Sequence, residues 1–256
     1  MDILTSNQNG ILVIEFNRPE KKNSITAAMY QVMADALKDA QSDAAVRVIL
    51  FTGKPEIFTA GNDLEDFMNS ASQGELADRP VAQFMLQLRQ ATKPVIAAVS
   101  GAAVGIGTTM LLHCDLVYAA DNAKFSMPFA KLGLCPEFAS SMLLPQAVGY
   151  QRAAEKLFFG EPFSAQEAFE MGLVNKVLPL DELLTFAKAQ ATKLTSLPAS
   201  SLRMTKSLMK SGQTDAVMAM MSEEGKHFSA MLLAPEAKEA FNAFFQKRKP
   251  DFTKFS

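Results

Sequence analysis

The sequence has little of what several common kinds of active site need. Its 256 residues include only two histidines, His113 and His227, and neither lies in an H-x-H or H-E-x-x-H spacing. A histidine-based metal site has little to build on, so we expect no metal. No G-x-S-x-G segment is present, and a serine hydrolase would therefore lack its nucleophile elbow.

Nucleotide-binding motifs are also missing. The segment from Gly101 to Gly107 reads G-x-x-x-G-x-G, which has neither the order of a dinucleotide fingerprint nor the lysine of a phosphate loop. The run 95–114 is free of charge when His113 is neutral, but Lys93-Pro94 precedes it and glycines interrupt it. That pattern predicts a strand, a turn and a buried helix rather than a membrane span.

Charge limits the partners that we expect, and the cysteines and the two ends of the sequence bear on the compartment. The formal net charge is −2 with a pI near 5.8, so we expect neither nucleic acid nor a membrane as a partner. The two cysteines, Cys114 and Cys135, lie in apolar surroundings that suit reduced, buried thiols. The first residues resemble neither a signal nor a transit peptide, and the final KFS is not a peroxisomal address. These features favour a cytoplasmic protein.

Hydrophobic periodicity predicts an α/β fold. Strand patterns at 11–16, 46–53, 95–99 and 115–119 alternate with helical patterns after Thr26, over 78–90 and after Gly105. This alternation indicates crossover units on a largely parallel sheet. Beyond about Pro145 helices dominate, and only 173–178 still has a strand pattern. We therefore expect an α/β core followed by a helical C-terminal region.

Two segments rich in small residues follow predicted strands. They read FTAGNDL (58–64) and SGAAVGIG (100–107). Open α/β sheets bind ligands at the carboxyl ends of their strands, where small residues let backbone N–H groups approach a ligand oxygen. Each segment is also compatible with nothing more than a tight turn.

A single carboxylate stands out in GLCPEFASSM (133–142). Glu137 is the only charged residue between Lys131 and Arg152. A carboxylate in an apolar loop has a raised pKa and can remove a proton alpha to a thioester, while two backbone donors stabilise the enolate. The alternative is an acid that merely favours the start of a helix over 138–147.

At these residues the sequence resembles the crotonase (enoyl-CoA hydratase/isomerase) superfamily. The resemblance spans nearly the whole chain. It rests on NRPEKKNSIT (17–26), FTAGNDLEDF (58–67), KPVIAAVSGAAVGIG (93–107), CDLVYAADNAKF (114–125), FGEPFSAQEAFEMGLVNKV (159–177) and FFQKRKPDF (244–252). It implies a spiral of ββα units over residues 1–195 and a C-terminal helical trimerisation region over 196–256. An acyl-CoA thioester would be the substrate, coenzyme A would be part of it rather than a cofactor, and the assembly would be a homotrimer or a dimer of trimers.

The resemblance also implies roles for individual residues. The backbone N–H groups of Ala60 and Ile106 would form the oxyanion hole. The two glutamates with which hydratases hold water are replaced by Thr109 and Phe129. Glu137 matches the single catalytic glutamate of the peroxisomal-type 3,2-enoyl-CoA isomerases. The residues expected to contact substrate are Lys22, Ala60, Gly61, Asn62, Asp63, Leu64, Ile106, Phe129, Phe244 and Lys247.

The resulting prediction is an isomerase that moves the double bond of a 3-enoyl-CoA to the 2-trans position in fatty-acid oxidation. Two alternatives stay open. One is a hydratase or another thioester reaction of the superfamily that uses Glu137 or a nearby acid with bound water. The other is a non-catalytic protein that binds acyl-CoA. For Lys22, Phe244 and Lys247, the alternative to a coenzyme A contact is an ordinary solvated surface position.

Overall fold

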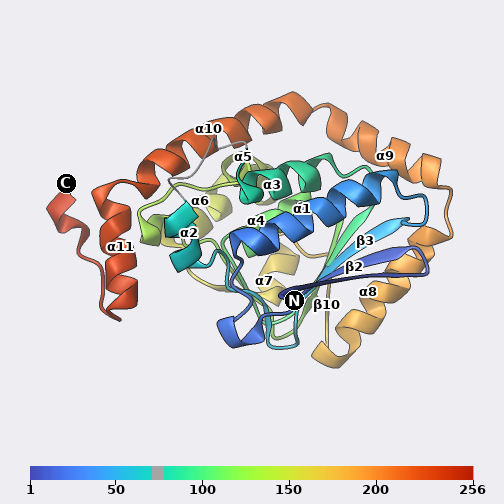
Figure 1. The fold of residues 1–256 in the computed structure, drawn as a ribbon, viewed down its shortest axis with the longest axis horizontal. Helices are drawn as coiled ribbons and strands as arrows, with labels where there is room; N and C mark the ends of the chain where they lie inside the picture. The colour runs from blue at the N-terminus through green and yellow to red at the C-terminus, as the bar shows by residue number, and fades with distance from the viewer. Residues whose placement is uncertain (71–77, 256) are drawn as a thin grey trace.

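The computed structural model describes residues 1–70 and 78–255. Two β-sheets form the centre, helices cover both faces of the larger sheet, and the last helices form an arc that ends beyond α11 (Figure 1). No helix in the described part of the chain is long and apolar enough to cross a membrane.

The larger sheet has six strands in the order β1-β2-β3-β5-β7-β10. β1 pairs with β2 in antiparallel fashion, and all other neighbours are parallel. The bounds are β1 Ile3–Gln8, β2 Ile11–Phe16, β3 Val48–Thr52, β5 Val95–Val99, β7 Leu116–Ala120 and β10 Lys176–Leu178. This sheet confirms the predicted α/β class.

The smaller sheet has the order β4-β6-β8-β9. Its strands are β4 Ile57–Thr59, β6 Ala102–Val104, β8 Lys124–Ser126 and β9 Phe163–Ser164. β4, β6 and β8 are parallel to one another, and each follows directly on a strand of the larger sheet. Successive turns of the chain thus add one strand to each sheet before a helix, as expected for a spiral of ββα units.

Eleven α-helices are present in the described residues. They are α1 Ala27–Ser42, α2 Leu64–Ser70, α3 Pro80–Gln90, α4 Ile106–Thr109, α5 Ser140–Val148, α6 Tyr150–Phe159, α7 Ala165–Glu170, α8 Leu180–Thr195, α9 Ala199–Ser211, α10 Thr214–Leu232 and α11 Pro235–Phe245. Short 3-10 helices lie at η1 Pro19–Lys21, η3 Met110–His113, η4 Ala130–Leu132 and η5 Phe252–Phe255.

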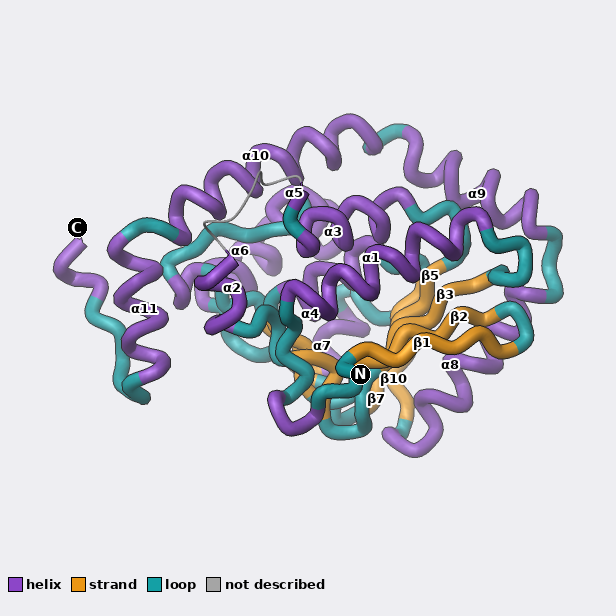
Figure 2. Tube along the Cα trace, in the orientation of Figure 1, coloured by secondary structure: helices purple, strands orange, loops and turns teal. Residues whose placement is uncertain are grey.

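The period-two pattern of β3 explains how the larger sheet is covered on both faces. Ile49 and Phe51 enter the main core with residues of α1 and α3, whereas Val48 and Leu50 enter a second core with residues of α8. Figure 2 shows the strands between α1 and α8 accordingly. Because both faces are buried, the strand is a continuous apolar run rather than an alternating one.

Two local features differ from the sequence-based expectation. β1 was not predicted, because only Ile3 of its six residues is buried and an edge strand of this kind shows no alternation. The helix after Gly105 is short: α4 ends at Thr109 and the chain continues as the 3-10 helix η3. Gly107 and the β-branched Thr108 and Thr109 are weak helix formers, which is consistent with that early end.

The C-terminal helices are tied to the core by a buried lysine. Lys206 of α9 donates to Asp115 Oδ2 at 2.6 Å and to Lys93 O at 2.8 Å. α10 then passes over α5 and α3 (Figure 1). The boundary at residue 195 and the trimerisation role of this region stay predictions.

Candidate active site

The two segments rich in small residues lie side by side because β4 and β6 are paired. A Cβ on Gly61 would approach Val104 O to 2.8 Å, and one on Gly107 would approach Thr59 Cγ2 to 2.4 Å. Gly61 also has a positive φ of 87°. Glycine at these positions therefore lets the two loops come close together.

Most backbone N–H groups of the first loop are already bonded. Ala60 N–H donates to Lys22 O at 3.0 Å, Gly61 N–H donates to Thr59 Oγ1 at 3.0 Å, and Asp63 N–H donates to Ile25 O at 2.9 Å. The Ala60 amide is thus not a free donor in this structure, contrary to the expectation from the resemblance. The physical reason is that Ala60 is the residue at which the loop is fastened to the chain after η1.

Asn62 carries the free amide of this loop. It forms a parallel bridge with Ile25, in which Gly61 and Asp63 bond to Ile25 while the groups of Asn62 point the other way. Within residues 1–70 and 78–255, the Asn62 N–H has no hydrogen-bond partner. Asn62, expected only as a substrate contact, therefore has the unpaired N–H that was expected of Ala60.

The second loop presents the amide of Ile106, as expected. Gly105 N–H donates to Ser126 O, and the amides of Thr108 and Thr109 return to Gly105 O. Ile106 is the first residue of α4, so its N–H has no intrahelical acceptor, and no other partner is found in the described part of the chain. Its side chain is fully buried in the main core, which removes any conflict with a ligand at the amide.

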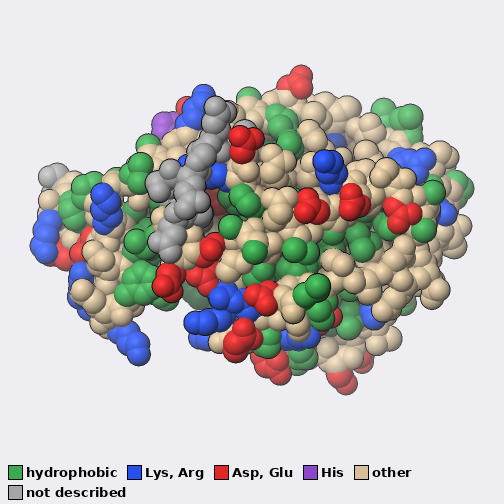
Figure 3. Space-filling view, in the orientation of Figure 1, with side chains coloured by type: hydrophobic (Ala, Val, Ile, Leu, Met, Phe, Trp, Pro, Cys, Tyr) green, Lys and Arg blue, Asp and Glu red, His purple; other side chains and the backbone are tan. Residues whose placement is uncertain are grey.

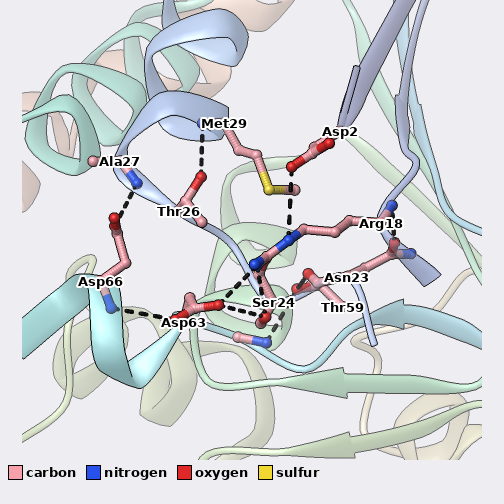
Figure 4. A network of polar contacts seen from close by, with 11 residues as sticks. Asp2, Arg18, Asn23, Ser24, Thr26, Ala27, Met29, Thr59, Asp63 and Asp66 are labelled. Atoms are coloured by element: carbon pink, nitrogen blue, oxygen red, sulfur yellow. Dashed lines mark hydrogen bonds and ion pairs between the residues drawn. The ribbon is translucent and has the colours of Figure 1, made fainter. Parts of the chain in front are cut away.

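A polar network fixes the first loop from the side of η1 (Figure 4). Arg18 Nη1 donates to Asp63 Oδ2 at 2.7 Å, and Ser24 Oγ donates to the same oxygen at 3.1 Å. Burial acts to raise the pKa of Asp63, but the hydrogen bonds outweigh it and the net pKa is lowered. Asp63 is thus an ionised anchor of the scaffold, and Leu64 begins α2 and packs against the core.

Asn23 holds the same segment through hydrogen bonds to β4. Its fully buried side chain accepts from Arg18 N and donates to Ile57 O and Phe58 O. Lys22 and Asn23 both have φ of 52°, so the chain turns sharply here in the left-handed region. Residues 17–26 are therefore held against β4 by hydrogen bonds. This explains why the motif lies beside the first loop.

The Glu137 carboxyl is buried, with the residue only 6% exposed. Its Oε1 has no hydrogen-bond partner within the described residues. Burial, and secondly the nearby Glu224, raise the pKa of Glu137 to about 8. A carboxyl without donors that changes its protonation near neutral pH is suited to accept and return a proton.

The backbone immediately after Glu137 has an uncommon conformation. Phe138 and Ala139 have φ of 63° and 55°, and neither is glycine. Each such residue costs about 1 to 2 kcal/mol and persists where surrounding contacts hold it. These two residues delay the start of α5 to Ser140, two residues later than the predicted helix over 138–147, so Glu137 lies in the loop before α5 and not directly at its first residue.

Contacts from two other elements hold this conformation. The His113 ring stacks on the Phe138 ring at 3.7 Å, and its Nε2 lies 2.8 Å from Phe138 O. Burial lowers the pKa of His113 to about 3, so this ring is neutral. From α10, the Glu224 carboxylate accepts from Ala139 N at 2.5 Å and from Ser141 N at 2.9 Å.

Tyr30 lies between the acid and the first loop. Its hydroxyl donates to Asn62 Oδ1 at 2.5 Å, and burial together with the Glu137 charge raises its pKa well above the usual value. The ring of Phe84 joins the Tyr30 and Phe138 rings, at centroid distances of 5.5 and 6.5 Å. The carboxyl of Glu137 and the amide of Asn62 are thus brought into one region by aromatic packing.

Sequence reasoning missed Tyr30, His113 and Glu224 as residues of this site. Tyr30 fits the apolar stripe of its helix, and a lone histidine carries no motif. Glu224 lies among other acidic and polar residues of α10, so its sequence contains no signal of burial. Each contact joins segments far apart in the chain, such as Glu224 and Ser141, which are 83 residues apart.

The two positions at which hydratases carry their glutamates are filled here by other side chains. Thr109 is fully buried, and within the described residues its Oγ1 has no hydrogen-bond partner. Phe129 is 4% exposed and its ring packs edge-on against Phe228 of α10 at 6.4 Å. Phe129 is therefore a packing residue between η4 and α10 in this structure, and its contact with substrate stays a prediction.

The expected coenzyme A contacts lie at the surface. The side chain of Lys22 is exposed, Phe244 is 61% exposed, and Lys247 follows α11 with φ of 54°. Figure 3 shows Lys, Arg, Asp and Glu side chains intermixed over the face of the molecule that it draws. Among residues 1–70 and 78–255, no group of His, Cys, Asp and Glu is arranged to hold a metal ion. The roles of Lys22, Phe244 and Lys247 stay predictions.

Comparisons with known proteins show which family the chain is similar to. Residues 6–254 match the family model described as enoyl-CoA hydratase/isomerase. The chain is 38% identical over 252 residues to enoyl-CoA delta isomerase 2 of Rattus norvegicus, covering 97% of this chain and 64% of the rat protein. It is 32% identical to 2,3-dehydroadipyl-CoA hydratase of Escherichia coli K12, covering 98% of both chains.

A solved structure extends the match to the fold. The enoyl-CoA hydratase/isomerase of Pseudoalteromonas atlantica T6c superimposes with a TM-score of 0.94 at 39% identity, over 99% of this chain and 100% of the other. The family model and the superimposed structure thus each cover nearly the whole chain. The chain belongs to the enoyl-CoA hydratase/isomerase family of the crotonase superfamily.

Proposed function

We propose that the protein is a Δ3-Δ2-enoyl-CoA isomerase that moves the double bond of a 3-enoyl-CoA to the 2-trans position. The observation that carries this proposal is the buried Glu137 carboxyl, free of donors in the described structure and with a pKa of about 8. The hydratase positions hold Thr109 and Phe129 instead of acids. The same single glutamate would then act on two carbons of one chain.

The proposed reaction is a proton shuttle. Ionised Glu137 removes a proton from C2, and the electron pair moves into the thioester, giving a dienolate. The Asn62 and Ile106 N–H groups donate to its oxygen, and losing one such donor typically costs about 2.7 to 4 kcal/mol. Glu137 then returns the proton to C4, the dienolate collapses to the conjugated thioester, and the enzyme is unchanged. Coenzyme A is part of the substrate, and no separate cofactor is required.

The surroundings of Glu137 favour isomerisation over hydration. Hydration in this family needs two acids to hold and activate water. The other carboxylate near Glu137 is Glu224, but both its oxygens accept hydrogen bonds from residues 139–141. It is also only 6% exposed. Glu224 is therefore held by residues 139–141, and of these two carboxyl groups Glu137 is the one left able to exchange a proton with substrate.

The test is direct conversion of a 3-enoyl-CoA to its conjugated isomer. Glu137→Gln keeps the shape of the side chain but removes the base, and we expect kcat to fall about 10² to 10⁴-fold. Glu161→Gln is the matched control, because Glu161 is exposed outside the site. An active Glu137→Gln variant would contradict the proposal, as would water addition to a 2-enoyl-CoA faster than isomerisation by the wild type.

A further inference from the structure

The carboxylate of Glu224, on α10, accepts hydrogen bonds from the backbone at the start of α5. Its Oε2 accepts from Ala139 N at 2.5 Å, and its Oε1 accepts from Ser141 N at 2.9 Å and from Ser141 Oγ at 2.5 Å. The carboxylate thus bonds the left-handed residue Ala139 and the first turn of α5 at once. Together with His113, which stacks on Phe138, it holds the backbone whose conformation places Glu137.

The two carboxyl groups have opposite surroundings. Glu224 receives three hydrogen bonds, all of which favour its ionised form, whereas Glu137 Oε1 receives none within the described residues. Burial and the Glu224 charge raise the pKa of Glu137, while burial raises that of Glu224 against these donors. Of the pair, Glu224 is therefore the group whose two oxygens are fixed by donors, and Glu137 is the one able to exchange protons.

Three other titratable groups in the described residues near Glu137 are neutral near pH 7. Tyr30 on α1 has a pKa raised well above its usual value by burial, and burial raises the pKa of Cys135, on the same loop, to about 11. Burial lowers the pKa of His113 on η3 to about 3. Among the described residues, Glu224 is thus the charged group that raises the pKa of Glu137.

We propose that Glu224 is a positioning residue for catalysis, which holds the backbone of residues 138–141 so that the Glu137 carboxyl faces the reacting carbons. The C-terminal helix α10 thereby completes the active site, in addition to any role in assembly. This inference rests on the proposed function, because positioning has meaning only when Glu137 is the base. Glu224 itself is not proposed to contact the substrate.

The test compares pH profiles of kcat/KM for wild type, Glu224→Gln and Ser141→Ala. In Glu224→Gln the negative neighbour is lost, so the acidic limb should move to lower pH by about one pH unit. The amide has a single acceptor oxygen, so its NH2 group faces either the Ala139 or the Ser141 N–H, and a displacement of the base of about 1 Å can lower kcat about 10²-fold. KM should change little, since no substrate contact is removed. Ser141→Ala removes one of the three bonds and should give a smaller fall in kcat without moving the limb.

The neighbouring Glu223 provides the control. It lies on the same helix, its side chain is 57% exposed, and its carboxylate contacts Lys226 and His227 of that helix. Glu223→Gln should leave kcat and the pH profile unchanged. The positioning role would be overturned if Glu224→Gln kept the wild-type limb and kcat, or if it lost activity only in proportion to unfolded protein. An active Glu137→Gln variant would instead refute the proposed function, so the two failures are distinguishable.

Discussion

Replacing Glu137 by glutamine should make the folded protein more stable than the wild type, and increasingly so as the pH rises. The folded-state pKa of Glu137 is raised from 4.5 to about 8 by burial and by Glu224. Between these values the folded protein binds a proton that the unfolded chain releases, so wild-type stability falls as the pH rises. Each pH unit of difference is worth about 1.4 kcal/mol, which gives an upper limit of about 5 kcal/mol above pH 8.

Glutamine has nearly the shape of the neutral acid and cannot ionise, so the variant escapes this loss. Urea unfolding at about pH 5, 6.5 and 8.5, at one protein concentration, measures the difference between the two proteins. Glu161→Gln should follow the wild type throughout. Parallel stability curves for wild type and Glu137→Gln would refute the reasoning, because they would mean that the Glu137 carboxyl is ionised without cost in the folded protein.

Three further predictions concern the pH–rate profile, the first donor loop and the anchor of α9. For the wild type, kcat/KM should rise with pH through about 8, because only the ionised carboxyl of Glu137 removes a proton; a flat profile between about pH 6 and 9 would contradict this. Gly61→Ala should lower kcat/KM about tenfold or more, because φ is 87° and the new methyl group would lie 2.8 Å from a backbone oxygen. Gly212→Ala, with nothing within 4 Å, should be neutral in the same assay. Lys206→Met should lower the free energy of unfolding by about 1 to 3 kcal/mol, since it leaves Asp115 and Lys93 O without their 2.6 and 2.8 Å bonds; an unchanged urea midpoint would argue against that role.

Much of the fold follows from local patterns. β3 and β5 are fully buried apolar runs, and Thr26 caps α1 by accepting from Met29 N–H, so these elements have strong signals in sequence. β1 could not be predicted because one buried residue makes no alternating pattern. α4 ends early at the weak helix formers Gly107, Thr108 and Thr109, and the close packing of Gly107 against Thr59 is a tertiary contact that no local pattern specifies.

The site was predictable where a single residue carries the chemistry. Glu137 stands out because its surroundings in sequence are apolar, whereas Ile106 was assigned through the resemblance alone. The identity of the first free amide depended on a hydrogen bond between Ala60 and Lys22, which fastens one N–H and leaves that of Asn62 open. Glu224 could not be found, because its partners Ala139 and Ser141 are 85 and 83 residues away in the chain.

The most direct test of the single-base shuttle is the fate of a labelled proton. A 3-enoyl-CoA deuterated at C2 would be converted in ordinary water, and the product analysed at C4 by mass spectrometry and NMR. Because the Glu137 residue is only 6% exposed, we expect part of the deuterium to be carried from C2 to C4 within one turnover. A product that contains only hydrogen at C4 at the earliest measurable conversion would contradict transfer by one shielded carboxyl.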